Sequence, residues 1–225
     1  MSYLEKARTA ILNTITATVP AAVWKGLGDQ IPWAYAEAHD SAENDPRVLP
    51  DQASFKAAQD RHFFLEYTLS TVAKETGSTF VSSIVLENGW RYGIFRAGKL
   101  TFTQKCVGSY GEIPPPAKFR ERLAESNGFI RQGKFAFMRE AVKVTEAEIN
   151  GVLIHGPENR NFKSPGFSRP AFICYAVPFP DYSGWMARYE LAELVASYVA
   201  AQPKAKKPEP KWKSQQKRDQ GKKGA

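Results

Sequence analysis

Three short runs of alternating apolar and polar residues between Phe80 and Cys106 constrain the fold more than any other feature of the sequence. The runs cover residues 80–86, 90–96 and 99–105, and the turn signals Asn88-Gly89 and Ala97-Gly98 separate them. Both residues of an Asn-Gly pair tolerate the positive φ of a type I′ turn. The segment therefore predicts a three-stranded meander, at about residues 80–105, with one apolar face that helices must cover.

Helical periodicity flanks this meander. Apolar residues at spacings of three and four predict an amphipathic helix before Pro20 and a longer one that ends at Gly77. We expect helices over residues 2–19, 33–38, 51–76 and 117–127, and a final helix that carries Met186, Tyr189, Leu191 and Leu194. Two further apolar runs, near residues 152–155 and 171–178, predict strands.

The order of these elements favours the α+β class. Helices come first, then the meander, a helix, two strands and a last helix, so sequential pairing predicts an antiparallel or mixed sheet. N-terminal, central and C-terminal helices would pack on it. We expect residues 1–202 to form a single globular domain.

The positive charge is concentrated at the C-terminal end. Residues 203–225 hold nine of the 31 Lys and Arg residues and two of the 23 Asp and Glu residues, so this tail carries +7 of the net +8. Its low apolar content predicts disorder, and its charge predicts phosphate contacts, with Trp212 able to stack on an unpaired base. The expected contact residues are Lys204, Lys206, Lys207, Lys211, Trp212, Lys213, Lys217, Arg218, Lys222 and Lys223.

A long polar loop from Glu158 to Pro170 is the first candidate site in the body. It carries Arg160, Lys163 and Arg169, and loops of this length inside a compact domain are often functional. The leading hypothesis is a nucleic-acid-binding protein, with DNA and RNA not distinguished. The tail would make sequence-independent contacts, and the loop would add specificity.

Two alternatives remain open. The first is a hydrolase or transferase centred on His155, with Cys106 and Asp181 as possible nucleophile and orienting residue. The second is a protein-protein interaction module whose tail is incidental. A perturbed His155 in a pocket with Cys106 would favour the enzyme. A flat basic face would favour nucleic acid, and an exposed aromatic patch would favour a protein partner.

The sequence predicts neither a metal nor a cofactor. The acidic segment 40–50 lacks the EF-hand pattern, and the Gly108 to Gly111 segment lacks the lysine of a P-loop. His62 and Glu66 share one helix face, where we expect a surface pair rather than a metal site or proton relay.

Two cysteines without zinc spacing, no apolar leader at the N-terminus and no run of about 18 apolar residues favour a soluble, cytoplasmic protein without membrane contact.

Overall fold

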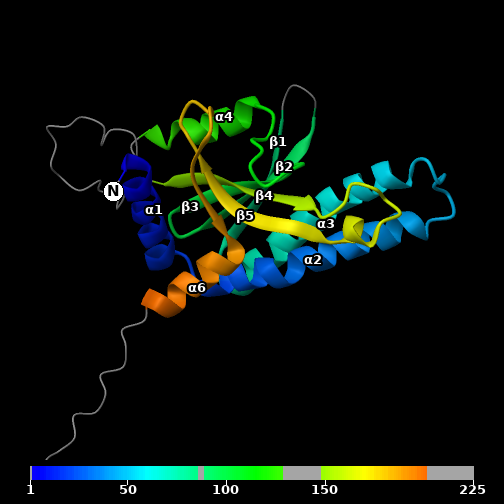
Figure 1. The fold of residues 1–225 in the computed structure, drawn as a ribbon, viewed down its shortest axis with the longest axis horizontal. Helices are drawn as coiled ribbons and strands as arrows, with labels where there is room; N and C mark the ends of the chain where they lie inside the picture. Colours follow the sequence, from blue (N-terminus) through cyan, green and yellow to red (C-terminus); the bar gives the residue numbers. More distant parts are fainter. Residues whose placement is uncertain (1, 86–88, 129–147, 202–225) are drawn as a thin grey trace, which may run out of the picture.

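The computed structural model describes residues 2–85, 89–128 and 148–201, which form a six-stranded sheet with helices against it (Figure 1). The strands are β1 (Thr79–Ile84), β2 (Arg91–Ala97), β3 (Leu100–Cys106), β4 (Ile149–Pro157), β5 (Pro170–Pro178) and β6 (Trp185–Glu190). The helices are α1 (Tyr3–Thr18), α2 (Ala21–Glu43), α3 (Ala53–Thr76), α4 (Lys118–Glu125), α6 (Leu191–Ala201) and the 3₁₀ helix η2 (Pro165–Ser168).

The strand order in the sheet follows the chain, from β1 to β6. Neighbouring strands are antiparallel except β3 and β4, which are parallel. A parallel pair needs a crossover connection, and α4 lies in that connection. The predicted α+β fold, with a mixed sheet built on the β1–β3 meander, is therefore confirmed.

Helices α1, α2, α3 and α6 cover one face of the sheet, and α4 lies across the other (Figure 1). Trp24 of α2 is fully buried at the centre of the core, with its ring 6.2 Å from that of Phe102 and 5.5 Å from that of Tyr175. Ser2 and Glu5 form a capping box that begins α1. Within the described residues, none of the helices combines the length and apolar composition that crossing a bilayer requires.

Helix α2 is much longer than the expected helix over residues 33–38. It runs from Ala21 to Glu43 and includes Gly26, Gly28 and Pro32. Local propensity argued against a helix there, but packing against α3 decides the outcome. A Cβ at Gly26 would lie only 3.2 Å from Val72 of α3, so the missing side chain lets the two helices approach closely.

The expectation that Met186 and Tyr189 lie on the last helix is wrong. They lie on β6, where Tyr189 pairs with Tyr175 of β5, and α6 begins only at Leu191. Met186 and Tyr189 are three positions apart, which fits one face of a helix. In the structure the backbone of this segment instead forms its hydrogen bonds with β5. The two predicted strands in this half of the chain, near residues 152–155 and 171–178, are confirmed as β4 and β5.

Candidate functional site

Strands β2 and β3 are paired over only part of their length. Three residue pairs join them, and the pair nearest the open end is Phe95 with Phe102. Strand β3 pairs with β4 along its whole length, as far as Cys106 opposite His155. The sheet therefore opens between β2 and β3 beyond Phe102.

The backbone of β3 faces this opening at alternate residues. The N–H of Val107 donates to the carbonyl of His155 at 2.8 Å, so the odd-numbered residues of β3 direct their backbone groups toward β4. The N–H and C=O groups of Gln104 and Cys106 consequently point to the side of β2. A continued ladder would place Gly93 opposite Gln104, but the described register has already ended there.

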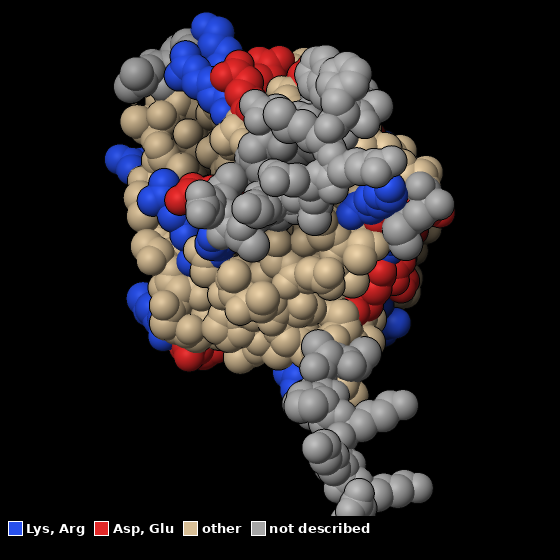
Figure 2. Space-filling model, turned by 90° about the vertical axis from the view of Figure 1, so that its left-hand side faces the viewer, with Lys and Arg blue, Asp and Glu red and all other residues tan. Residues whose placement is uncertain are grey.

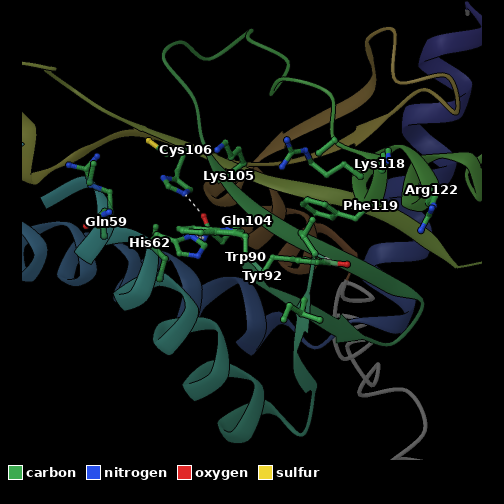
Figure 3. Close-up of a pocket in the computed structure, with 18 of the residues that line it drawn as sticks. Gln59, His62, Trp90, Tyr92, Gln104, Lys105, Cys106, Lys118, Phe119 and Arg122 are labelled. Carbon is green, nitrogen blue, oxygen red and sulfur yellow. Dashed lines mark hydrogen bonds between the residues drawn. The ribbon is translucent and has the colours of Figure 1, made fainter. Parts of the chain in front are cut away.

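A cavity of about 770 Å³ lies at this opening, between α3, α4 and the ends of β1, β2 and β3 (Figure 3). This volume is within the range of small-molecule binding sites. Among the described residues, its lining includes five Lys and Arg side chains and no Asp or Glu. The five cations are Arg61, Lys105, Lys118, Arg120 and Arg122.

Three polar side chains form a hydrogen-bonded chain at the inner wall of the cavity. The Tyr35 hydroxyl donates to Nδ1 of His155 at 2.6 Å. Nε2 of His155 donates to the side-chain oxygen of Gln104 at 3.1 Å (Figure 3). The amide nitrogen of Gln104 faces Glu66 at 3.1 Å. A carboxylate only accepts hydrogen bonds, so the Gln104 atom that faces Glu66 is its NH₂ group. The oxygen of Gln104 therefore accepts from Nε2 of His155, and Nδ1 of His155 accepts from the Tyr35 hydroxyl.

His62 and Glu66 of α3 bridge the opening between the strands. Gln104 on β3 donates to Nδ1 of His62 at 2.7 Å and to Glu66, while Glu66 also accepts from the backbone N–H of Gly93 on β2. His62 also has a hydrogen bond with the backbone of Arg91. Helix side chains thus occupy the place of missing ladder bonds, and the pair lies half-buried instead of on the surface as expected.

Burial controls the charge of these groups. Desolvation, followed by the nearby Arg61, lowers the pKa of His155 to about 3, so its imidazole is neutral at physiological pH. Burial also lowers the pKa of His62 and raises the pKa of Glu66. The inner wall is therefore a neutral network at His155 and His62, and the positive charge of the cavity comes from its lysines and arginines.

Aromatic rings line the outer part of the cavity. Trp90 is 47% exposed, and its ring lies 5.1 Å from that of His62. Tyr92 and Phe119 stack with centroids 4.0 Å apart, and the guanidinium of Arg120 lies 4.9 Å from the Phe119 ring. Flat apolar surfaces and cations therefore share one cavity.

The structure brings together two of the three candidate catalytic residues. Cys106 and His155 are register partners on β3 and β4, and both line the cavity. Asp181 lies beyond the far end of β5, where it accepts a hydrogen bond from Ser183. Both nitrogens of His155 are bonded, to Tyr35 and Gln104, so the imidazole does not stand ready as a base for Cys106.

The Glu158 to Pro170 loop is anchored outside the cavity lining. Its base is closed by the N–H of Glu158 donating to the carbonyl of Arg169 at 3.0 Å. Phe162 stacks on His39 with centroids 4.7 Å apart, and Phe167 is buried beside Arg61. The predicted contact residues Arg160, Lys163 and Arg169 are exposed on this loop.

His39 also faces two acidic side chains on α2. Its Nδ1 lies 3.5 Å from Asp40 and 3.6 Å from Glu43, while its Nε2 is 3.1 Å from the carbonyl oxygen of Phe162. The imidazole thereby joins the end of α2 to the loop, which is a structural role.

Residues 203–225, with the predicted contacts from Lys204 to Lys223, lie outside the described residues. A separate exposed aromatic group, made of Trp33, Phe63 and Tyr67, lies on α2 and α3. This is the surface that the interaction-module alternative would use.

Sequence reasoning missed Arg61, Gln104, Lys105 and Trp90 as site residues. The spacing on α3 could have identified Arg61. It lies four residues after Ala57 and four residues before Leu65, and all three residues are buried. A charged residue inside a buried helix stripe indicates a special environment. The cavity itself had no local signal, since it depends on where β2 leaves β3.

Neither the family models nor the curated proteins and solved structures that were compared with this chain include a significant match.

Proposed function

We propose that the protein binds nucleic acid and takes an unpaired nucleotide into the cavity between β2 and β3. One observation carries the proposal: the described lining of the cavity holds five Lys and Arg side chains and no Asp or Glu, beside the exposed ring of Trp90. A ligand that matches this lining is anionic and has a flat ring. Nucleotides combine both properties.

The two parts of such a ligand have separate contacts. A base stacked on Trp90 contributes about 1 to 3 kcal/mol, and it does so for any base because every base has a π-face. Lys105 and Lys118 lie on one side of the cavity in Figure 3, where they can approach a phosphate. This arrangement supports binding with little sequence preference.

The cavity favours single strands over duplexes. Bases in a duplex are stacked and paired inside the helix, so a base enters a protein cavity only after it has left the stack. Unpaired strands already present their bases. The body would therefore supply the preference for single strands, and the lysine-rich tail would add contacts that depend on charge alone.

One face of the molecule outside the cavity supports this division. On the side that carries α1 and α6, the described basic and acidic residues lie interspersed around a broad uncharged area (Figure 2). Charge on this side alternates in sign, in contrast to the cavity lining. The cavity is thus the better candidate for recognition by the body.

The enzyme alternative has less support. Cys106 lies in the cavity, but His155, its register partner on β4, is fully buried and bonded at both nitrogens. A binding role requires no rearrangement of the hydrogen bonds of His155.

The test is equilibrium binding of labelled single- and double-stranded DNA and RNA across a salt series. The proteins are the full chain, a chain ending at Gln202, and the variants Trp90→Ala and Trp33→Ala. Trp33 is 44% exposed on α2 outside the cavity lining, which makes it a matched control for Trp90.

We expect the shortened chain to retain a preference for single strands with a shallower salt dependence. Trp90→Ala should weaken single-strand binding about 5- to 150-fold, and Trp33→Ala should leave it unchanged. Equal binding of single and double strands by the shortened chain, or no effect of Trp90→Ala, would contradict the proposal.

A further inference from the structure

Arg61 of α3 is a buried cation at the inner end of the cavity. The residue is 4% exposed and belongs to the cavity lining. Its guanidinium lies between two rings, 4.3 Å from the centroid of Tyr35 and 4.7 Å from that of Phe167. Its Nη2 donates to the carbonyl of Phe167 at 3.2 Å.

The polar contacts of Arg61 are incomplete within the described part of the chain. Its Nε is buried and has no hydrogen-bond partner there, and no ion pair joins the guanidinium to a carboxylate among these residues. An arginine side chain stays protonated in proteins, and a buried charge without an opposite charge is costly. The two rings and one carbonyl compensate for this only in part.

The described groups around Arg61 offer no negative charge in place of an ion-pair partner. His155 is held neutral between Tyr35 and Gln104, and its pKa is lowered first by burial and then by the positive charges of Arg61 and Lys105. Two cations therefore act on the inner end of the cavity. An anion bound there would supply the partner that Arg61 lacks.

We propose that Arg61 binds a terminal phosphate, the phosphomonoester group of a mononucleotide or of a strand end. This inference rests on the proposed function and specifies its ligand. A phosphomonoester carries nearly two negative charges at neutral pH, whereas an internal phosphodiester carries one. Because Arg61 lies almost completely buried, the end of a ligand reaches it more readily than the middle of a continuous strand.

The phosphomonoester could belong to a free mononucleotide or to a strand end, and two sets of probes distinguish these ligands. Mononucleotide binding is measured with AMP, adenosine, ribose 5-phosphate and inorganic phosphate. Strand-end binding is measured with short single-stranded oligonucleotides that carry a 5′-phosphate, a 3′-phosphate or hydroxyls at both ends. The readouts are calorimetric affinity and the ligand-induced rise in the melting temperature of the full chain.

The variants are Arg61→Met, Arg61→Lys and Lys74→Met. Lys74 lies exposed in the last turn of the same helix, outside the cavity lining, so its substitution removes one positive charge without touching the site. Arg61→Lys keeps the charge but loses the planar, stacked group. Circular dichroism establishes that each variant is folded before binding is compared.

We expect AMP to bind and adenosine to bind about 10- to 100-fold more weakly, and we expect one phosphorylated strand end to be preferred over hydroxyl ends. Arg61→Met should abolish this phosphate preference, Arg61→Lys should restore part of it, and Lys74→Met should retain it. A preference for AMP without one for phosphorylated strands would assign the site to free mononucleotides. If Arg61→Met fails to fold, the wild-type comparison of AMP with adenosine decides alone.

Equal affinity for phosphorylated and unphosphorylated ligands would overturn the inference, as would phosphate preference that persists in Arg61→Met. The proposed function fails in a different way. If ribose 5-phosphate binds through Arg61 while Trp90→Ala has no effect on any nucleotide or strand, the anion site stands and the nucleotide-binding proposal does not.

Discussion

The side-chain oxygen of Gln104 on β3 accepts a hydrogen bond from Nε2 of His155 on β4 at 3.1 Å. This contact directs the amide nitrogen of Gln104 toward His62 and Glu66 of α3. One amide therefore holds two strands and a helix in register around the cavity. Buried networks of this kind are stable when every member has a partner and become costly when one is removed.

Replacing Gln104 should therefore lower stability. Gln104→Met keeps the side-chain shape but leaves His155, His62 and Glu66 each without one partner, and we expect a loss of about 3 kcal/mol in the free energy of unfolding. Urea denaturation measures this. Gln30→Met is the control, because Gln30 bonds to Glu75 on the exposed surface, and its loss should cost under about 0.5 kcal/mol. Equal losses in the two variants would show that the network adds no stability.

Stability should fall as the pH drops below about 6.5. The pKa of His155 is lowered to about 3 in the folded state, against 6.5 in an unfolded chain, so between these values the unfolded chain binds more protons. Going from about pH 7.5 to 5.5 should cost about 1.4 kcal/mol from His155. The lowered pKa of His62 acts in the same direction.

Glu66 acts in the opposite direction at lower pH. Burial raises its pKa above 4.5, so its contribution to stability is largest below that pH and is lost as the pH rises through its folded-state pKa. Comparison with His155→Gln separates the two effects, because the variant retains Glu66. The wild type should lose more stability than His155→Gln between pH 7.5 and 5.5. Identical pH profiles would contradict the lowered pKa of His155.

Alanine substitution at two glycines should change the stability of the protein in opposite directions. A Cβ at Gly93 would overlap the carboxylate of Glu66 and the ring of Phe80, whereas a Cβ at Gly28 would meet no atom within 4 Å. We expect Gly93→Ala to cost about 1 to 3 kcal/mol and Gly28→Ala to add about 0.5 to 1 kcal/mol through helix propensity. Thermal denaturation of both variants tests this. A neutral Gly93→Ala would mean that Glu66 and Phe80 move aside readily.

The two cysteines should differ in reactivity toward a thiol reagent. Cys106 is exposed and lines the cavity, while Cys174 is buried, and burial raises its pKa to about 11. One thiol per chain should react quickly in the native protein, and Cys106→Ser should remove that fast phase. Saturating AMP should slow the reaction of Cys106. An unchanged rate would indicate that the nucleotide binds elsewhere.

The sequence by itself determined the elements whose signals are local. The alternation from Phe80 to Cys106 predicted the meander, and the helix before Gly77 ends there as expected, with that residue at φ 67°. Both signals act through neighbouring residues, since side-chain alternation and backbone freedom do not depend on the rest of the chain. The same holds for the charge of residues 203–225.

Only the tertiary structure decided where the cavity lies and what lines it. Trp90 precedes β2, whereas Gln104, His155 and Arg61 lie on β3, β4 and α3, and none of the four is unusual within its own segment of the sequence. Their meeting depends on β2 joining β3 only from Phe95 onward and on α3 bridging the opening. The length of α2 and the strand character of β6 also depend on partners distant in sequence. Such contacts result from long-range packing and strand pairing, which local periodicity does not encode.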